Sequence, residues 1–340
     1  MSEIAIIGAG AWGTALSIVL GREDSHRVRL WAHEKEVCDA ISAHRVNEKF
    51  LPEQRIPACV KPCNDLAEAL QGAAIVVSVM PSQHCRRLFE RMRPHLGADT
   101  MIVSATKGLE ETSLLRMTEV IVQIMKGNGI PAPRIGALSG PSFALEAARG
   151  DPTAITIASE DKELARFVQK EFSHASFRLY TNDDPVGVEL GGALKNVVAI
   201  AAGVCAGLGL GHNSVAALIT RGLAEMTRLV VACGGKAETM AGLAGLGDLV
   251  LTCTGGLSRN RSVGVELGRG YKLPEILAGM HGMVAEGIFT TTAAVGLARA
   301  RGVEMPITEQ MHAILHQGKP PREAIQELMS RSSKSETLRG

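Results

Sequence analysis

The stretch VGVELGGALKNVVAIAAGVC, at residues 186–205, decides how this chain is organised. Asp184 can cap a helix that begins here, and Pro185 suits the first helical position, where a missing N–H leaves no extra group unpaired. Almost every later residue is small or apolar, which is typical of a helix surrounded by protein. The pattern predicts a buried helix that carries Lys195 in its middle.

Lys195 has two interpretations. Burial strips water from the ammonium group, which lowers its pKa and lets it exchange a proton near neutral pH. Alternatively, the apolar stem carries the charge out to solvent. The stretch alone favours the second interpretation, because lysine stems commonly reach water. The motifs elsewhere in the chain favour the first.

The composition limits the classes of function. A chain of 340 residues has room for about two domains. The formal charge is +1, so we expect neither nucleic acid nor a membrane surface as a partner, and no stable membrane insertion. The seven cysteines are scattered and show no metal-ligand spacing, which indicates free thiols, a reducing cytoplasm and no bound metal.

A glycine loop follows the first apolar run. Residues 4–7 are strand-like, GAGAWG occupies residues 8–13, and residues 14–20 are helical in pattern. In such a loop Gly8 permits the turn, Gly10 lets a pyrophosphate approach the backbone, and Gly13 lets helix and strand pack closely. A turn without a ligand is the alternative. The strand before the loop and the helix after it favour a dinucleotide site.

The cofactor's adenosine ribose is expected near the end of the second strand, residues 28–31. The residue that reads it lies about 20 positions beyond the last glycine, at His33. Glu34 could accept a hydrogen bond from a 2′-hydroxyl, whereas His33 or Lys35 could meet a 2′-phosphate. The sequence therefore leaves NAD and NADP both open.

Strands and helices alternate up to residue 180, and from Pro185 onward only helical patterns remain. We expect an α/β fold with an N-terminal doubly wound, mostly parallel sheet, followed by an all-helical domain. The expected units are residues 1–184, residues 185–331 and a frayed tail at 332–340. The expected helices of the second unit span 185–206, 213–234, 236–244, 258–268, 272–280, 290–301, 305–317 and 321–330.

Polar residues follow three of the predicted elements. Lys107, Gly140 and Ser142 come after strands, and ligands of doubly wound sheets bind at the carboxyl ends of the strands. Asp248 follows a glycine-rich turn. Taken singly, a loop lysine could be solvated, and Ser142 or Asp248 could be a helix cap. Their shared location favours a site.

A candidate phosphate site follows at Ser258, Arg259 and Asn260. Guanidinium offers a planar fork of donors that suits phosphate, and the neighbouring hydroxyl and amide groups add further donors. The alternative for Arg259 is a surface ion pair.

Together these motifs resemble the bacterial-type NAD(P)-dependent glycerol-3-phosphate dehydrogenases. The resemblance implies a Rossmann domain followed by a helical domain, in a cytoplasmic homodimer that uses NAD or NADP. It also implies reduction of dihydroxyacetone phosphate to sn-glycerol 3-phosphate for glycerophospholipid synthesis. The motifs, in chain order, are GAGAWGTA at 8–15, LWAHE at 30–34, TKG at 106–108, SGPSFA at 139–144, ALKN at 193–196, GLGDL at 245–249, SRNR at 258–261 and VAEG at 284–287.

The resemblance also implies roles for individual residues. Lys195 would be the catalytic acid and base. Ala11 stands where many members of the family carry serine, and backbone N–H groups can replace that hydroxyl. The substrate residues would be Lys107, Gly140, Ser142, Lys195, Asp248, Ser258, Arg259 and Asn260. The cofactor residues would be Gly8, Gly10, Ala11, Trp12, Gly13, His33, Lys107, Ala144, Arg259, Val284 and Glu286.

Two other functions fit parts of this pattern. One is another two-domain dehydrogenase that acts on a different hydroxy acid, since arginine binds carboxylate as well as phosphate. The other is a dinucleotide-binding sensor without chemistry. A comparison of turnover with dihydroxyacetone phosphate and with unphosphorylated dihydroxyacetone would test the first alternative. Oxidation of the reduced cofactor in the presence of substrate would exclude the second.

Overall fold

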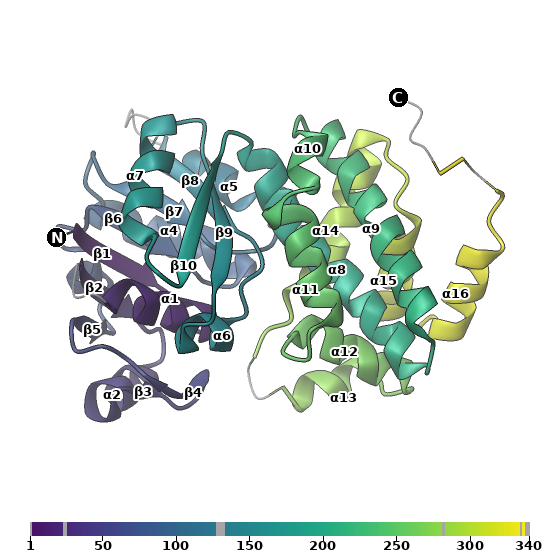
Figure 1. Ribbon diagram of the computed structural model, residues 1–340, viewed down its shortest axis with the longest axis horizontal. Helices are drawn as coiled ribbons and strands as arrows, with labels where there is room; N and C mark the ends of the chain where they lie inside the picture. Colours follow the sequence, from purple (N-terminus) through teal and green to yellow (C-terminus); the bar gives the residue numbers. More distant parts are fainter. Residues whose placement is uncertain (1, 23–25, 127–132, 281–282, 334, 337–340) are drawn as a thin grey trace.

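The computed structural model describes residues 2–22, 26–126, 133–280, 283–333 and 335–336. A sheet flanked by helices occupies one half of the molecule, and a group of helices occupies the other (Figure 1). Strands end and helices take over at Pro185, where the sequence pattern changes. Part of the tail expected at 332–340, residues 334 and 337–340, lies outside the described residues.

The sheet has eight strands in the order β10-β9-β8-β7-β6-β1-β2-β5. Every neighbouring pair is parallel except β8–β9, which confirms the mostly parallel sheet. The strand order reverses between β1 and β6, the place where such folds bind ligands. The strands are β1 (Ser2–Ile7), β2 (His26–Trp31), β5 (Val60–Cys63), β6 (Ile75–Ser78), β7 (Met101–Ser104), β8 (Ile135–Ser139), β9 (Thr153–Ala158) and β10 (Phe177–Asn182).

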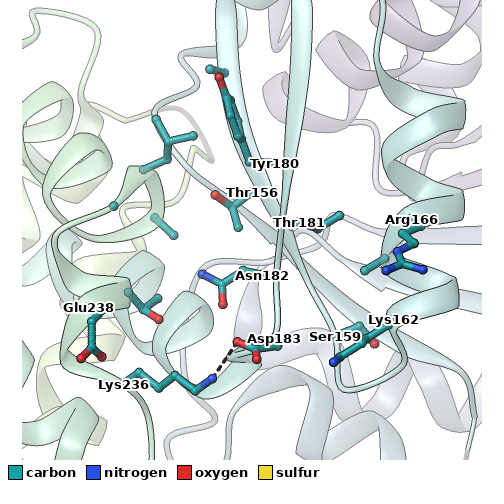
Figure 2. Close-up of a pocket in the computed structure, with 16 residues that line it drawn as sticks. Thr156, Ser159, Lys162, Arg166, Tyr180, Thr181, Asn182, Asp183, Lys236 and Glu238 are labelled. Atoms are coloured by element: carbon teal, nitrogen blue, oxygen red, sulfur yellow. Dashed lines mark hydrogen bonds and ion pairs between the residues drawn. The ribbon is translucent and has the colours of Figure 1, made fainter.

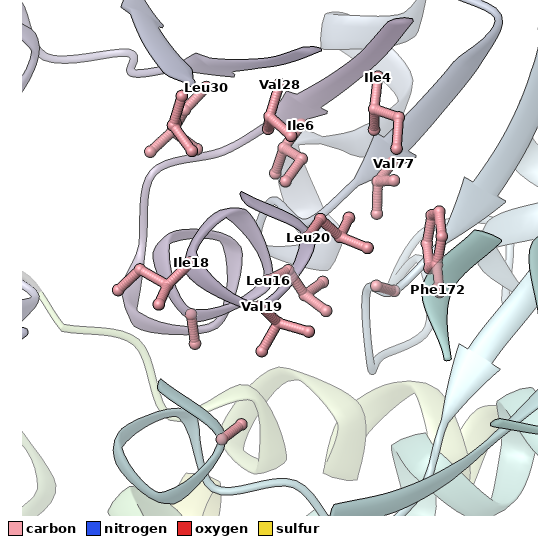
Figure 3. Packing of buried hydrophobic residues seen from close by; sticks show 14 of the residues in the cluster. Ile4, Ile6, Leu16, Ile18, Val19, Leu20, Val28, Leu30, Val77 and Phe172 are labelled. Atoms are coloured by element: carbon pink, nitrogen blue, oxygen red, sulfur yellow. The ribbon is translucent and has the colours of Figure 1, made fainter. Parts of the chain in front are cut away.

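Helices cover both faces of the sheet and bury two apolar cores. On one face Ile4 and Ile6 of β1 pack with Leu16 of the first helix and with Phe172 (Figure 3). The other face buries a separate cluster around Phe89. The helices of this half are α1 (Ala11–Gly21), α2 (Lys35–His44), α3 (Leu66–Leu70), α4 (Cys85–Met92), α5 (Met117–Met125), α6 (Ala144–Arg149) and α7 (Lys162–Phe172), with 3-10 turns η1 (Ser82–His84) and η2 (Arg93–His95).

A small hairpin between β2 and β5 did not follow from the sequence pattern. It consists of β3 (Val46–Asn47) and β4 (Leu51–Arg55), which pair antiparallel. The strands are too short for apolar alternation to be recognised. The hairpin lies beside α2 at the lower edge of the sheet half (Figure 1).

The second half is helical, as predicted, but the expected helices need correction. No helix was expected where α11 lies, and α14 begins at Glu286 instead of residue 290. A helix was expected over 236–244 and a tight turn at 245–248, whereas α10 ends at Met240 and a π-turn, η3 (Leu243–Gly247), leads directly into α11. Gly245 makes this possible, because a Cβ there would overlap the backbone of Met240. The helices are α8 (Pro185–Gly207), α9 (His212–Ala232), α10 (Ala237–Met240), α11 (Asp248–Thr254), α12 (Arg259–Gly268), α13 (Leu273–Ala278), α14 (Glu286–Arg301), α15 (Pro306–Gln317) and α16 (Pro321–Met329).

Helix α8 is the central helix of this half. The Asp184 carboxylate caps it by accepting from the Gly187 N–H at 2.8 Å, and Pro185 is its first residue. By length and composition α8 could cross a membrane, but 89% of its most apolar window is buried inside the protein. Its apolar surface is therefore the core of the helical half.

A buried ion pair ties α8 to the sheet half. The Glu189 carboxylate accepts from Arg116 Nη1 at 2.5 Å, from the Thr118 hydroxyl at 2.5 Å and from the Thr118 N–H at 2.9 Å. Glu189 lies in the second turn of α8, and Arg116 and Thr118 lie at the start of α5. The pair therefore fixes the helix that carries Lys195 against the sheet.

Helices α8 and α12 cross in direct backbone contact. A Cβ at Gly203 would overlap the carbonyl oxygen of Arg261, and a Cβ at Gly264 would overlap that of Ile200. Neither carbonyl can move without breaking its helix. The glycines thus set how close the first residues of α12 come to α8.

We predict that Gly264→Ala lowers the free energy of unfolding by about 1–3 kcal/mol or more, because the added methyl group overpacks this crossing. Gly279→Ala is the matched control, since Gly279 has an ordinary φ of −74° and its nearest neighbour to an added Cβ is 3.5 Å away. Denaturant unfolding of both variants measures the difference. Equal losses in the two variants would show that the crossing is not tightly packed.

Candidate active site

The candidate site lies where the carboxyl edge of the sheet faces α8. The loop after β7 brings Lys107, the loop after β8 brings Gly140 and Ser142, α8 brings Lys195, and Asp248 begins α11. Four separate segments of the chain therefore meet at one point.

Asp248 lies between two ammonium groups. Its Oδ1 is 2.8 Å from Lys195 Nζ, and its Oδ2 is 2.7 Å from Lys107 Nζ. The Asp248 and Lys195 side chains are 1% and 7% exposed, so this charge cluster is shielded from bulk water. One carboxylate and two ammonium groups leave the cluster with a surplus positive charge.

The two lysines differ in how many of their ammonium N–H groups already have an acceptor. Lys107 Nζ donates to Asp248, to the Gly140 carbonyl at 2.9 Å and to the Ser142 hydroxyl at 3.3 Å, which uses all three. Lys195 Nζ is bonded to Asp248 and donates to the Thr252 hydroxyl at 2.7 Å; within the described part of the chain it has no third acceptor. Lys195 therefore keeps one N–H for a ligand.

Burial controls the charge state of this cluster. Burial lowers the pKa of Lys195; Asp248 opposes this fall and the neighbouring Lys107 charge adds to it, so that the resulting pKa is about 8. Burial alone would raise the pKa of Asp248, but the two ammonium groups outweigh it and hold that pKa below its usual value. Lys195 is thus buried and able to titrate near neutral pH, and the interpretation in which its stem reaches solvent is wrong.

Two glycines allow the loops to approach. Gly140 has a φ of +140°, and a Cβ there would lie 2.9 Å from the Cα of Ile155. Gly108, after Lys107, would place a Cβ 2.6 Å from the Ser82 hydroxyl. Both loops therefore depend on glycine, at positions the sequence motifs contain.

A chain of amide groups connects this cluster to α12 and α14. The Asn196 side chain donates to the Lys107 carbonyl at 3.4 Å and accepts from Asn260 at 3.0 Å, and Asn260 in turn accepts from the Gly287 N–H at 2.9 Å. The sequence assigned no role to Asn196 or Thr252. A role for Asn196 could have been inferred, because it is a polar residue in an apolar helix. No pattern in the sequence pointed to Thr252.

The other substrate candidates lie at the start of α12. Ser258 is its N-cap and accepts from the Arg261 N–H at 3.2 Å. Arg259 is exposed, and no ion-pair partner for it occurs among the described residues, so the surface ion pair considered for it is not found. Asn260 joins the amide chain described above. The Arg259 guanidinium, which the Glu286 carboxylate attracts without forming a direct ion pair, therefore lies at a helix N-terminus, and this combination suits an anion.

The glycine loop fits a dinucleotide. Helix α1 begins after Gly10 with no side-chain cap, and a Cβ at Gly10 would meet nothing within 4 Å. A Cβ at Gly13 would overlap the Gly8 carbonyl, and Gly8 has a φ of +124°. The Trp12 indole N–H is buried without a partner among the described residues. Free N–H groups facing open space suit a pyrophosphate.

A residue outside the motifs holds this loop. Asn47, in the β3–β4 hairpin, is buried and donates at 2.8 Å both to the Ala9 carbonyl and to the Thr14 hydroxyl. No sequence pattern pointed to Asn47, because its contact with Thr14 spans more than thirty residues. The hairpin is thereby attached to the glycine loop.

The remaining cofactor candidates are spread around the carboxyl edge. His33 follows β2, Ala144 is the first residue of α6, and Val284 lies just before α14. Glu286 begins α14, and its carboxylate accepts from the Ser82 N–H at 3.1 Å and the Ser82 hydroxyl at 2.6 Å. Glu286 thus contacts the loop after β6. His33, Ala144 and Val284 form no hydrogen bond or ion pair with the lysine cluster among the described residues.

A cavity lies away from this cluster. It has a volume of about 760 Å³ and opens between β9, β10 and α10 (Figure 2). Tyr180, Asn182 and the Lys236–Asp183 ion pair, whose atoms are 2.7 Å apart, line it. No residue predicted for substrate or cofactor lines this cavity.

Two family models match this chain. Residues 3–165 match the family model described as NAD-dependent glycerol-3-phosphate dehydrogenase N-terminus, and residues 184–326 match the corresponding C-terminus. The chain is 68% identical over 336 residues to the glycerol-3-phosphate dehydrogenase (NAD(P)+) of Koribacter versatilis, and the match covers 99% of each.

Solved structures agree. The crystal structure of glycerol-3-phosphate dehydrogenase from Coxiella burnetii superposes with a TM-score of 0.91 at 42% identity, covering 97% of this chain and 99% of that one. D-mandelate dehydrogenase, at a TM-score of 0.62 and 13% identity, covers 95% of this chain and 99% of its own, and shares the fold alone.

We predict opposite shifts of the Lys195 pKa in two variants. Asp248→Asn removes a negative charge and lowers it below about 8, whereas Lys107→Met removes a positive charge and raises it. Titration of ¹³C-labelled lysine by NMR measures the pKa. Lys236→Met, which breaks an exposed pair with Asp183, is the control and leaves it unchanged. Shifts in the same direction would contradict the cluster described.

Proposed function

Since the chain belongs to the NAD-dependent glycerol-3-phosphate dehydrogenase family, we propose that the lysine cluster around Asp248 carries the proton in its reaction. The enzyme has glycerol-3-phosphate dehydrogenase activity with NAD(P)+ as coenzyme. In the proposed direction it reduces dihydroxyacetone phosphate to sn-glycerol 3-phosphate, in the cytoplasm, for glycerophospholipid synthesis. The observation that carries this proposal is the one N–H of Lys195 that has no acceptor among the residues the structure describes.

The reaction needs a hydride and a proton. A nicotinamide held by the glycine loop would supply the hydride to the ketone carbon, so that negative charge would develop on the carbonyl oxygen. Lys195, as an ammonium ion, donates its free N–H to that oxygen and transfers the proton. The amine is then reprotonated from solvent before the next turnover. In the reverse direction the neutral amine takes the proton from the alcohol.

Asp248 and Lys107 have supporting roles in this proposal. Asp248 receives one lysine on each carboxylate oxygen, so it holds Lys195 in place. Lys107 is bonded to three acceptors, so it fixes Asp248 and the Gly140 loop and contributes positive charge. Thr252 holds the Lys195 amine from the other side while donating to the Asp248 carbonyl at 2.6 Å.

The phosphate of the substrate is proposed to bind at the start of α12. Arg259 supplies a guanidinium that forms no direct ion pair within the described residues, and Ser258 and Asn260 lie beside it at the helix N-terminus. The glycine crossing and the Asn196–Asn260 hydrogen bond fix this end of α12 relative to Lys195. Binding energy gained at the phosphate can therefore align the carbonyl with the lysine.

The wider organisation is proposed on the same basis. Residues 1–184 would bind the dinucleotide through the glycine loop, His33 and Ala144, and Val284 and Glu286 would reach it from the helical half. Residues 185–331 would form the substrate and catalytic domain. A homodimer is the expected assembly. Both alternative functions give way, because full-length identity of 68% to a glycerol-3-phosphate dehydrogenase favours that substrate over another hydroxy acid and an enzyme over a sensor.

We predict that Lys195→Met lowers kcat for dihydroxyacetone phosphate reduction by about 10²–10⁴-fold, because the general acid is lost while side-chain volume is kept. The steady-state rate at which the absorbance of the reduced cofactor falls measures kcat, and thermal unfolding checks that the variant is folded. Lys236→Met, an exposed lysine outside the cluster, keeps the wild-type kcat. A folded Lys195→Met enzyme with near-normal kcat would end the proposal.

A further inference from the structure

Three side chains gather beyond β2, at the place where dinucleotide folds read the adenosine ribose. The strand ends at Trp31 and buried Ala32, so no acidic residue stands at its tip. His33 is exposed, and Glu34 is the N-cap position of α2. From the hairpin, Lys49 Nζ reaches to 3.4 Å from Glu34 Oε1.

Lys49 is brought there by a fixed segment. Asn47 is 1% exposed and is bonded to the glycine loop, as described above, and its Oδ1 accepts from the Phe50 N–H at 3.2 Å. Lys49 lies between these two anchored residues, with its ammonium 4.9 Å from the centre of the Phe50 ring. The hairpin and the pyrophosphate loop therefore form one unit, and Lys49 has a defined position at its rim.

Lys35 is nearer to β2 in sequence but is directed elsewhere. Its ammonium is 2.7 Å from Asp39 on the next turn of α2, and both side chains are well exposed. On the other side of the loop, the Asn64 amide donates to the carbonyls of Ala32 and His33 at 2.8 and 3.1 Å. The segment after β2 is thus held so that Glu34, and not Lys35, faces Lys49.

We propose that Glu34 and Lys49 form the subsite that discriminates a 2′-hydroxyl from a 2′-phosphate, which rests on the proposed use of a nicotinamide dinucleotide. A lone Glu34 carboxylate would accept from a ribose hydroxyl and repel a phosphate. Lys49 neutralises it and can turn to a 2′-phosphate instead. The pair is exposed, so opening it costs little. Both dinucleotides are therefore accepted, and Lys49 is the residue that admits the phosphorylated one.

Isothermal titration with adenosine 5′-monophosphate and adenosine 2′,5′-bisphosphate tests the subsite without any chemistry. Lys49→Met should weaken bisphosphate binding by about tenfold and leave the monophosphate within about twofold, because only the 2′-phosphate loses a charge-assisted hydrogen bond. Glu34→Gln should strengthen bisphosphate binding. Lys35→Met is the matched control and should change neither affinity.

Steady-state kcat/KM with NADPH and NADH gives the second readout, and the ratio should fall in Lys49→Met and rise in Glu34→Gln. Loss of bisphosphate affinity in Lys35→Met instead, or equal losses for both nucleotides in Lys49→Met, would overturn the assignment. Failure of wild-type protein to bind either nucleotide would overturn the dinucleotide site itself. Nucleotide binding does not depend on Lys195. The proposed subsite and the proposed role of Lys195 can therefore be refuted independently.

Discussion

A single buried carboxylate, shared by two ammonium groups, is the constraint on which this structure depends. Asp248 is 1% exposed and would be costly to bury alone, and the same holds for Lys195. Each compensates the other, and Lys107 adds a second positive charge from the sheet half. Because a buried charge without its partner is strongly unfavourable, the two halves must meet with these three side chains in register.

The rest of the fold supplies that register by close backbone packing. Glycines let α8 and α12 touch, let the loop after β8 pass over β9, and let η3 deliver Asp248 directly into α11. Glu189 and Arg116 lock α8 to the sheet two turns before Lys195. These glycines therefore have a structural role. They let the segments that carry the polar groups approach one another closely, and a proton donor requires such positioning.

Much of this could be predicted from the sequence, because the deciding signals are local. The all-apolar surroundings of Lys195 predicted a buried helix, and a strand followed by GAGAWG predicted a dinucleotide fold. Lys107, Gly140 and Ser142 were grouped because they follow parallel strands. Asn47 and Thr252 were missed, since their importance comes from partners far along the chain. The π-turn before Asp248 was missed because five residues carry no period.

The most direct test of the central claim is kcat measured across pH in both directions on the wild-type enzyme. Lys195 has a pKa of about 8, so ketone reduction, which needs the ammonium, should fall as pH rises through that value. Alcohol oxidation, which needs the neutral amine, should rise through it. A reduction kcat that stays level from about pH 6 to about pH 10 would contradict a proton supplied by this lysine.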